Sequence, residues 1–213
     1  MPSLTTQEIA KLLTPFLPAP PEGLPEKLAL YLELLLKWNA RTNLTAIRTP
    51  AEIVTRHFGE SLFTAQILPP TQTLLDYGTG AGFPGLPIAL LRPDIKVTLA
   101  ESQNKKVSFL REAVRTLNIP VEIWAKRVED MPPAQRYDTV TLRAVDAMVP
   151  AIQGAEPRAK NDLVILTSQS GAKEIPTLPS FAPAQTTPMP QSEDRIIVTF
   201  KRTGSEQPTA GSQ

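Results

Sequence analysis

The chain has 213 residues, of which 41% are hydrophobic and 20% charged, and it contains no cysteine. This composition supports one folded domain with an extension, and it excludes disulfides, thiolate metal sites and cysteine nucleophiles. The formal net charge of +1 is far below that of many free nucleic-acid binders. Any contact with a nucleic acid therefore needs a local basic face or help from a partner protein.

Residues 1–70 are expected to form a helical extension packed on a larger core. Prolines divide residues 1–23 into short helical pieces. Residues 25–38 place apolar side chains at spacings of three and four, and residues 50–68 predict another helix with a weak point at Gly59. The first residues lack a basic stretch followed by a long apolar run, and no segment is apolar enough to span a bilayer. We therefore expect a cytoplasmic protein with no membrane contact.

From residue 71 the pattern changes to short strands alternating with helices. The expected elements follow the order TLLDY, PIALLRP, KVTLAES, KKVSFLREAVRTLN, VEIWAKR, DTVTLRAV, a helix near 146–159, and DLVILTS. This alternation predicts an α/β fold over 71–203, with a mostly parallel seven-stranded sheet and helices on both faces. The five prolines of 174–193 indicate a long irregular loop, whereas 195–202 is expected to be an edge strand and 204–213 a disordered tail.

A glycine-rich turn, DYGTGAG, joins the first of these strands to the next helix. Glycines let the backbone turn sharply and approach a ligand closely. Dinucleotide-binding folds typically show G-x-G-x-x-G, whereas the spacing here is G-x-G-x-G, with Asp76 two residues before the first glycine. An acidic residue suits the cationic amino-acid end of S-adenosylmethionine better than it suits a pyrophosphate. The turn therefore favours a Rossmann-like, S-adenosylmethionine-dependent methyltransferase over a nicotinamide or flavin enzyme.

Two later segments complete the expected cofactor site. Glu101 ends the second strand, at the distance where such folds place a carboxylate for the ribose hydroxyls. The run 127–130 follows the third strand and is expected to flank the adenine, with Val128 packing on the ring and Glu129 or nearby backbone at its amino edge. A solvated charged turn is the alternative for this run. The residues expected to bind the cofactor are Asp76, Gly78, Thr79, Gly80, Phe83, Glu101, Ser102, Val128, Glu129 and Arg143.

Arg143 ends the fourth strand beside this crevice. Its guanidinium can fork onto a guanine, a phosphate or the methionine carboxylate, and the alternative is a structural salt bridge with Asp76 or Glu101. A group of basic side chains is expected to form a phosphate-binding rim or, alternatively, a solvated helix face: Lys105, Lys106, Arg111, Arg115, Lys126, Arg127 and Arg136. The residues expected to contact RNA are Arg56, His57, Lys105, Lys106, Arg111 and Arg127.

Missing chemistry narrows the choice of methyl acceptor. Methylation at carbon 5 of a pyrimidine usually needs a cysteine nucleophile, which this chain lacks. Exocyclic amines are commonly methylated by enzymes with an [Asp/Asn/Ser]-Pro-Pro-[Tyr/Phe] run, and this chain has Leu-Arg-Ala-Val at 142–145. Guanine N7 carries an in-plane lone pair and needs alignment but no deprotonation, which fits a site without a clear general base. Because the chain has a single histidine, no metal is expected.

These motifs resemble those of the small-subunit ribosomal RNA methyltransferase G family, also called the glucose-inhibited division protein B family. The resemblance covers about residues 25–202 and rests on Trp38-Asn39, Asn43-Leu44-Thr45, Arg56-His57, DYGTGAGFPGLPIALLRP, ESQNKKVSFL, the 127–129 run and YDTVTLRAV. It implies methyl transfer from S-adenosylmethionine to N7 of a guanine in small-subunit (16S) ribosomal RNA, near the decoding region. The cofactor contacts it implies are Gly78, Phe83, Val128, Glu129 and Arg143. The expected catalytic residues are Arg143, Lys105 and Arg127.

The chain departs from the family pattern at three positions. Leu142 stands where serine is usual, Glu60 where aspartate is usual, and Ser170 where the fifth strand commonly ends in lysine. The missing lysine removes one positive charge from the mouth of the site. We therefore expect the protein to act on ribosomal RNA within a ribosomal particle. We also expect it to be a monomer. Two other functions stay open: a non-catalytic ribosome- or RNA-binding module with the same fold, and a dinucleotide-dependent enzyme.

Overall fold

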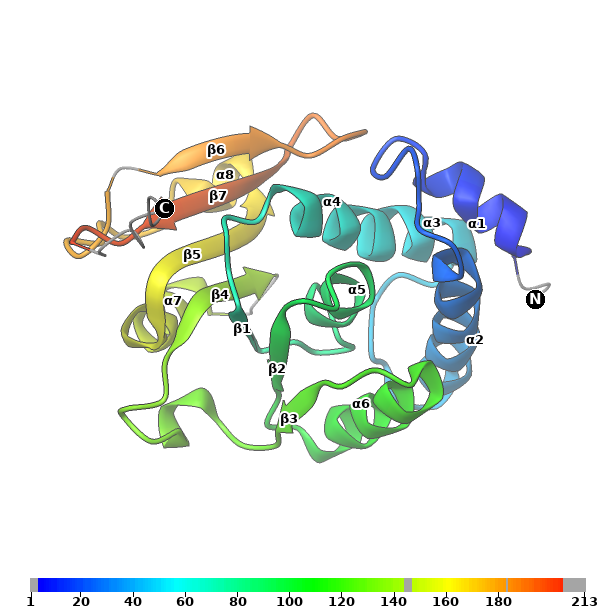
Figure 1. Cartoon of the computed structure of the whole chain (residues 1–213), viewed down its shortest axis with the longest axis horizontal. Coiled ribbons are helices and arrows are strands. Elements are labelled where there is room, and N and C mark those ends of the chain that lie inside the picture. The colour runs from blue at the N-terminus through cyan, green and yellow to red at the C-terminus, as the bar shows by residue number, and fades with distance from the viewer. Residues whose placement is uncertain (1–3, 144–146, 183, 205–213) are drawn as a thin grey trace, which may run out of the picture.

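The computed structural model describes residues 4–143, 147–182 and 184–204, and within them it shows one sheet with helices on both faces (Figure 1). The strands lie in the order β3-β2-β1-β4-β5-β7-β6, and β7 runs antiparallel to both of its neighbours. Their bounds are β1 Thr73–Tyr77, β2 Lys96–Ala100, β3 Glu122–Trp124, β4 Tyr137–Arg143, β5 Ala159–Ser168, β6 Gln185–Pro188 and β7 Arg195–Lys201. The predicted α/β fold with a mostly parallel seven-stranded sheet is confirmed.

The helices follow the predicted order along the chain. Their bounds are α1 Thr6–Leu13, α2 Leu24–Thr42, α3 Pro50–Glu52, η1 Ile53–Gly59, α4 Glu60–Ile67, α5 Gly85–Leu91, α6 Asn104–Leu117, η2 Val128–Asp130, α7 Met148–Ala155, η3 Glu156–Arg158 and α8 Gln169–Ala172. A capping box starts α1, in which the side chains of Thr5 and Glu8 bind each other's backbone amides. The second helix runs four residues beyond its predicted end and stops at Asn43, which adopts a left-handed conformation.

The helix predicted over 50–68 contains a π-helical segment, η1, which ends at the predicted weak point, Gly59. A Cβ added at Gly59 would lie 2.6 Å from a ring carbon of Phe16. The glycine therefore lets the chain after α1 pack directly on the helix backbone. This close contact packs the segment after α1 against η1.

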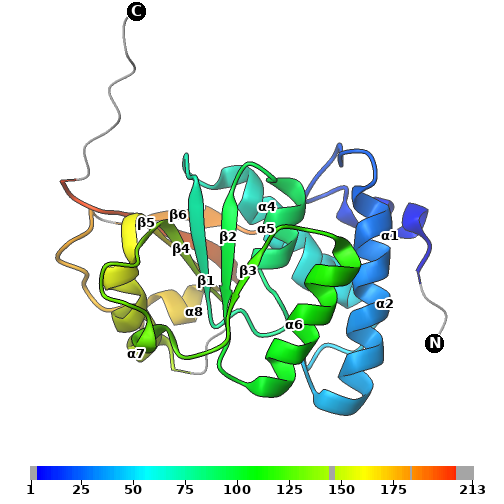
Figure 2. The ribbon, with the colours of Figure 1, turned by 60° about the horizontal axis from the view of Figure 1, so that its bottom comes forward.

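Alternate residues of the strands point to opposite faces of the sheet. Leu74 packs in a cluster with side chains from α1, α2, α4, α5 and α6, whereas its neighbour Leu75 packs in a second cluster with α7. Figure 2 shows α2 and α6 running side by side on the first face. The helices before residue 70 thus share one hydrophobic core with the sheet. Within the described ranges, none of the helices has the length and apolar character needed to cross a membrane.

The C-terminal part of the sheet corrects two predictions. The proline-rich stretch 174–193 was expected to be irregular, but it contains β6, which pairs with β7 through residue pairs such as Thr186 and Val198. Consequently β6 forms the edge of the sheet, and β7 lies between β5 and β6. The edge tolerates Pro188 because an outer strand needs hydrogen bonds on one side only. The predicted strand end at 144–145 and the tail after residue 204 lie outside the described residues.

Gly85 offers a test of packing between α5 and the sheet. A Cβ added there would lie 2.3 Å from Leu99 Cδ2 and 2.7 Å from Asp76 Oδ2. We expect Gly85→Ala to lower the free energy of unfolding by about 1–3 kcal/mol, because a buried strand side chain must move. Urea unfolding followed by circular dichroism measures this change. Thr116→Ser, at an exposed position of α6, is the control and is expected to change it by less than about 0.5 kcal/mol. A Gly85→Ala protein as stable as the parent would contradict the expected clash.

Candidate active site

The loop between β1 and α5 curls over the carboxyl end of β1 because its glycines adopt left-handed angles. The φ values are 65° at Gly78, 59° at Gly80 and 91° at Gly82. The Thr79 amide donates to the Ala100 carbonyl at 3.0 Å, which fastens the loop to the end of β2. Space around Gly80 is open, since the nearest heavy atom to an added Cβ would be a backbone oxygen 3.9 Å away. The loop therefore presents bare backbone to a concave surface.

Asp76 lies beneath this loop and is fully buried. Its Oδ2 accepts hydrogen bonds from the Thr79 hydroxyl and, at 2.8 Å, from the Gly85 amide, while Oδ1 accepts one from the Thr141 hydroxyl at 2.9 Å. Burial raises the pKa of Asp76 to about 6, and these hydrogen bonds limit the rise. From the sequence, this carboxylate was expected to bind the cofactor. The structure corrects that placement: the side chain holds the loop from below and lines neither cavity of the site.

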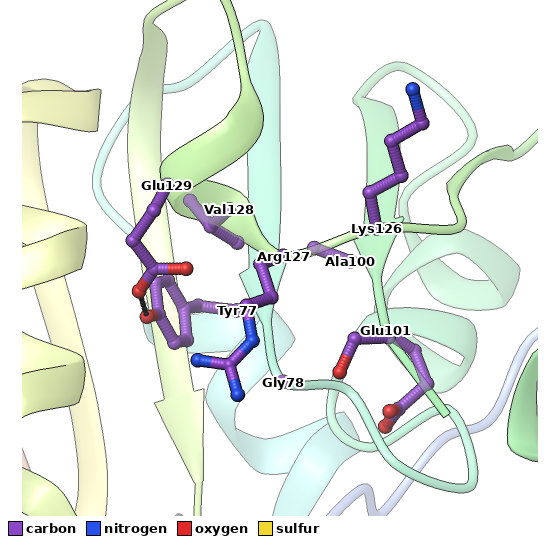
Figure 3. Close-up of a pocket in the computed structure, with 9 residues that line it drawn as sticks. Tyr77, Gly78, Ala100, Glu101, Lys126, Arg127, Val128 and Glu129 are labelled. Carbon is purple, nitrogen blue, oxygen red and sulfur yellow. Dashed lines mark hydrogen bonds between the residues drawn. The ribbon is translucent and has the colours of Figure 1, made fainter.

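Two adjoining cavities open at the carboxyl edge of the sheet, as expected for an open α/β fold. The smaller, of about 240 Å³, is lined by Tyr77, Gly78, Ala100, Glu101, Ser102, Lys126, Arg127, Val128 and Glu129 (Figure 3). The larger, of about 560 Å³, is lined by Leu44, Thr45, Ala46, Ile47, His57, Gly78, Thr79, Gly80, Ala81, Phe83, Glu101, Gln103, Lys106 and Arg143. Gly78 and Glu101 line both cavities and therefore form the boundary between them.

Glu101 is held firmly at this boundary. Its carboxylate is 7% exposed and accepts hydrogen bonds from the Gly80 amide at 3.2 Å and the Gln103 amide at 2.8 Å. Lys106 Nζ lies 4.0 Å from the same carboxylate. A carboxylate has about four acceptor positions, so capacity remains for ligand hydroxyls. Its predicted role toward a ribose is compatible with this geometry.

The smaller cavity has an apolar wall and an acidic end. Val128, 4% exposed, forms the wall, and the Tyr77 hydroxyl donates to Glu129 Oε1 at 2.6 Å. This hydrogen bond lowers the pKa of Glu129, whereas burial and the same bond raise the pKa of Tyr77 well above its usual range. The phenol is therefore the donor and the carboxylate the acceptor. Figure 3 shows the side chain of Arg127 extending toward Tyr77 and that of Lys126 pointing away from it.

The larger cavity has an aromatic wall. The His57 ring stacks on Phe83 with centroids 4.6 Å apart, and its Nε2 lies 2.8 Å from Thr45 Oγ1. The guanidinium carbon of Arg143 lies 5.9 Å from the centre of the Phe83 ring. Burial, with the positive charge of Arg143 adding to it, lowers the pKa of His57 to about 2. This histidine is therefore neutral at physiological pH.

A buried carboxylate, Glu60, is the salt-bridge partner of Arg143. Arg143 Nη2 donates to Glu60 Oε2 at 3.0 Å and also to the backbone carbonyl of Arg56. The same carboxylate accepts from Arg56 Nε at 3.1 Å and from Arg195 Nη2 at 3.0 Å. We call these four residues the Glu60 cluster. The predicted alternative of a salt bridge to Asp76 or Glu101 is wrong, because the side chain of Arg143 turns toward the junction of η1 and α4.

The Glu60 cluster carries an excess of positive charge. Three arginines surround one glutamate that is 1% exposed. Burial lowers the pKa of Arg143 to about 10, so its guanidinium stays charged at neutral pH. Its Nη1 is buried and has no hydrogen-bond partner among the described residues, while the side chain lines the larger cavity. Since an unpaired buried donor on a cation is costly, this group is suited to bind an anion.

The residues expected to contact RNA lie at several places around the cavities. Lys105 and Lys106 occupy the first turn of α6 beside the crevice, and Arg111 is exposed farther along the same helix. Arg56 is 43% exposed in its side chain but is already paired with Glu60. Because His57 is neutral and forms part of a cavity wall, it contributes no charge toward phosphates.

Two members of the predicted basic rim lie elsewhere. Arg115 is in the last turn of α6, about 16 Å along the helix axis from its start. Arg136 precedes β4 and donates to the Ala159 carbonyl at 3.0 Å, at the amino edge of the sheet. The crevice is at the carboxyl edge. Including these two arginines in the rim was therefore wrong.

Nine of the ten residues expected to bind the cofactor line the two cavities, and Asp76 is the exception. Tyr77 was not predicted to belong to the site, although it lies inside the glycine motif. Glu60 was recognised only as a departure from a family pattern. Among the residues that the structure describes, no group of three or more histidine or acidic side chains could hold a metal ion.

The buried carboxylate of Asp76 makes a pH-dependent prediction. Its pKa is about 6 in the folded protein and 3.8 in the usual reference. Folding therefore favours the protonated form, and this contribution to stability is complete below pH 3.8 and lost as the pH rises through 6. Relative to Asp76→Asn, the free energy of unfolding of the parent is expected to fall by about 3 kcal/mol between these limits. Chemical denaturation at several pH values measures both proteins, and parallel curves would disprove the raised pKa.

The family is shown by comparison with known sequences. The sequence model described as rRNA small subunit methyltransferase G matches residues 25–187. A protein named ribosomal RNA small subunit methyltransferase G from Xanthomonas euvesicatoria pv. vesicatoria is 40% identical over 153 residues, which cover 70% of this chain and 72% of the relative. A protein of the same name from Stenotrophomonas maltophilia is 47% identical over 119 residues, covering 55% and 56%.

Solved structures show the same fold at low identity. TYW2 from P. horikoshii in complex with MeSAdo is similar with a TM-score of 0.51 and 17% identity, covering 68% of this chain and 62% of that protein. A ribosomal protein L11 methylase from Lactobacillus delbrueckii subsp. bulgaricus has a TM-score of 0.52 and 11% identity, covering 69% and 78%. Together with the sequence matches, these observations show that the chain belongs to the rRNA small subunit methyltransferase G family.

Proposed function

We propose that this protein transfers the methyl group of S-adenosylmethionine to N7 of a guanine in small-subunit (16S) ribosomal RNA. The observation that carries the proposal is the pair of cavities that meet at Glu101, with Arg143 lining the larger one and its buried Nη1 lacking a hydrogen-bond partner among the described residues. S-adenosylmethionine has ribose hydroxyls near its middle and a carboxylate at one end. A fixed carboxylate and a buried cation at these places complement both groups.

The cofactor is assigned residues along both cavities. Val128 and Glu129 are proposed to hold the adenine, Glu101 the ribose, and Arg143 the methionine carboxylate. The open space at Gly80 supports this assignment, because a ligand can approach the backbone there. Asp76 is proposed to act indirectly, by holding the loop in its curled form. Bound in this way, S-adenosylmethionine supplies an electrophilic methyl group attached to a sulfonium.

The protein's own residues orient the acceptor and exclude water. His57 lines the larger cavity as a neutral ring stacked on Phe83, and the base is proposed to stack on this histidine. Guanine N7 attacks with its lone pair and releases no proton, so the neutral His57, with a pKa near 2, is not needed as a base. Lys105 and Arg127 are proposed to hold the phosphates of the RNA at the two sides of the site, and Arg143 to align the reacting groups.

The N-terminal extension is proposed to take part in the site. Residues 44–47, which precede the sheet, line the larger cavity together with the glycine loop. The sequence was divided into an extension over 1–70, a core over 71–203 and a tail over 204–213. The proposed active site uses residues of both the extension and the core.

The substrate form follows from charge. Net charge is +1, and an exposed serine, Ser170, stands at a position where a lysine was expected. We propose that the protein works in the cytoplasm as a monomer and recognises the RNA in a ribosomal particle, where bound proteins help position it. The exposed Ser170 also supports the second candidate function, a non-catalytic ribosome-binding module. A dinucleotide-dependent enzyme is disfavoured by family membership.

Arg143→Ala tests the reaction. We expect methyl transfer to fall by about 100-fold or more, because a buried cation at the reacting centre is lost. The fold should persist, since Glu60 keeps Arg56 and Arg195 as partners. Arg195→Ala removes another arginine from the same carboxylate but no cavity-lining side chain, so it should retain activity within a few-fold. If both variants lost the same share of methyl-transfer activity, the effect would come from disrupting the Glu60 cluster and not from a specific role of Arg143.

The acceptor is tested by mapping N7-methylguanine on ribosomal RNA from cells with and without the gene. We expect one small-subunit position to lose the modification without the gene, and Arg143→Ala not to restore it. An unchanged map would favour the non-catalytic module.

Lys105→Gln tests the RNA contact. Each phosphate contact releases counterions, so the slope of log affinity against log salt should become less steep by about one unit. Lys201→Gln is the control. Lys201 lies opposite Asp162 in the register of β5 and β7, at the amino edge of the parallel strands and away from the cavities, so the slope should not change. Methylation is also expected to be faster on the small-subunit particle than on its naked RNA. Equal rates on both substrates would contradict assisted recognition.

A further inference from the structure

A hydrogen bond joins two of the side chains that line the smaller cavity, Tyr77 and Glu129 (Figure 3). The Tyr77 hydroxyl donates to Glu129 Oε1 at 2.6 Å, across 52 residues of sequence. Tyr77 ends β1, and Glu129 lies in η2. The bond therefore ties the central strand of the site to the segment after β3.

A glycine in α7 gives this pair its space. A Cβ added at Gly154 would lie 2.7 Å from Tyr77 Oη and 3.1 Å from Glu129 Oε1. The helix backbone thus approaches both polar groups closely and limits their rotation. Tyr77 also packs against the hydrophobic cluster on this face of the sheet. The phenol is held in position, so it can in turn hold the carboxylate.

The pair has a defined proton arrangement. The hydroxyl is a donor to the carboxylate, and this bond lowers the pKa of Glu129. An ionised carboxylate only accepts hydrogen bonds, whereas a protonated one can also donate. A purine with an amino group at position 6 offers a donor there, and a purine with a carbonyl at position 6 offers an acceptor. An ionised carboxylate placed opposite position 6 therefore accepts a hydrogen bond from the amino group and repels the carbonyl oxygen.

We propose that Tyr77 is a positioning residue that fixes Glu129 as an ionised acceptor and so makes the smaller cavity select a 6-aminopurine over a 6-oxopurine. This inference rests on the proposed placement of the adenosyl group in that cavity. It assigns to Tyr77 a role in ligand specificity, exerted through Glu129. Tyr77 itself packs beside the ligand without reading its edge.

The test compares two ligands that differ at position 6 of the purine. Calorimetry gives the dissociation constants of S-adenosylhomocysteine and S-inosylhomocysteine for the parent and for Tyr77→Phe. The parent is expected to prefer the adenosyl ligand, and Tyr77→Phe to reduce this preference about tenfold, since one hydrogen bond to a charged group is lost. Thermal unfolding checks that both proteins are folded.

Tyr137→Phe is the matched control. The Tyr137 hydroxyl is also hydrogen-bonded, accepting from Gln135 Nε2 at 2.7 Å, but this buried tyrosine does not line the cavity. Its removal should leave the ratio of the two dissociation constants unchanged. A purely structural role of Tyr77 predicts that Tyr77→Phe weakens both ligands equally, and that result would overturn the proposal.

A pH series gives a second readout. Without the Tyr77 hydroxyl, the pKa of Glu129 is expected to rise, so its carboxylate gains a proton at a higher pH. The pH at which the adenosyl preference disappears on acidification should therefore be higher in Tyr77→Phe than in the parent. An unchanged midpoint would count against the positioning role.

A parent protein that binds both ligands equally would overturn the placement of the purine itself, whereas parent selectivity that survives in Tyr77→Phe would overturn only the role of Tyr77.

Discussion

One buried carboxylate joins three parts of the chain on which the site depends. Glu60 accepts hydrogen bonds from arginines in η1, β4 and β7, and it is 1% exposed. A charge buried without partners costs several kcal/mol, so the four side chains of the Glu60 cluster constrain one another. Their pairing joins the η1–α4 junction to β4 and β7 and holds Arg143 in the cavity wall. Burial, reinforced by the positive charges of the three arginines, lowers the pKa of His57 and keeps it uncharged.

Charged side chains are spread along both cavities. Lys126, Arg127 and Glu129 line the smaller cavity, Lys106 and Arg143 line the larger one, and Glu101 lies at their boundary. The two carboxylates are held by contacts that exist before a ligand binds, including backbone amides on Glu101 and the phenol on Glu129. A ligand that meets preorganised groups loses less free energy to their ordering.

Local signals predicted most of the fold, and long-range pairing explains what they missed. Alternating strands and helices gave the sheet, and glycine spacing placed the loop. The strand β6 was missed because four residues among prolines carry little pattern, and its partner β7 supplies the order. The role of Glu60 was missed because its partner Arg143 lies 83 residues away. Asp76 was misplaced because a motif gives the position of a residue but not which hydrogen bonds already occupy its oxygens.

The proline-bounded edge strand has a consequence for self-association. The long apolar strand β5 would offer a row of unpaired backbone groups if the sheet ended there, and such rows template the addition of strands from other molecules. Instead β7 covers β5, and the outer position falls to β6, which has four residues and ends at Pro188. A short edge that lacks an amide at its end is a poor template. The short strand β6 thus makes the sheet less prone to edge-to-edge aggregation.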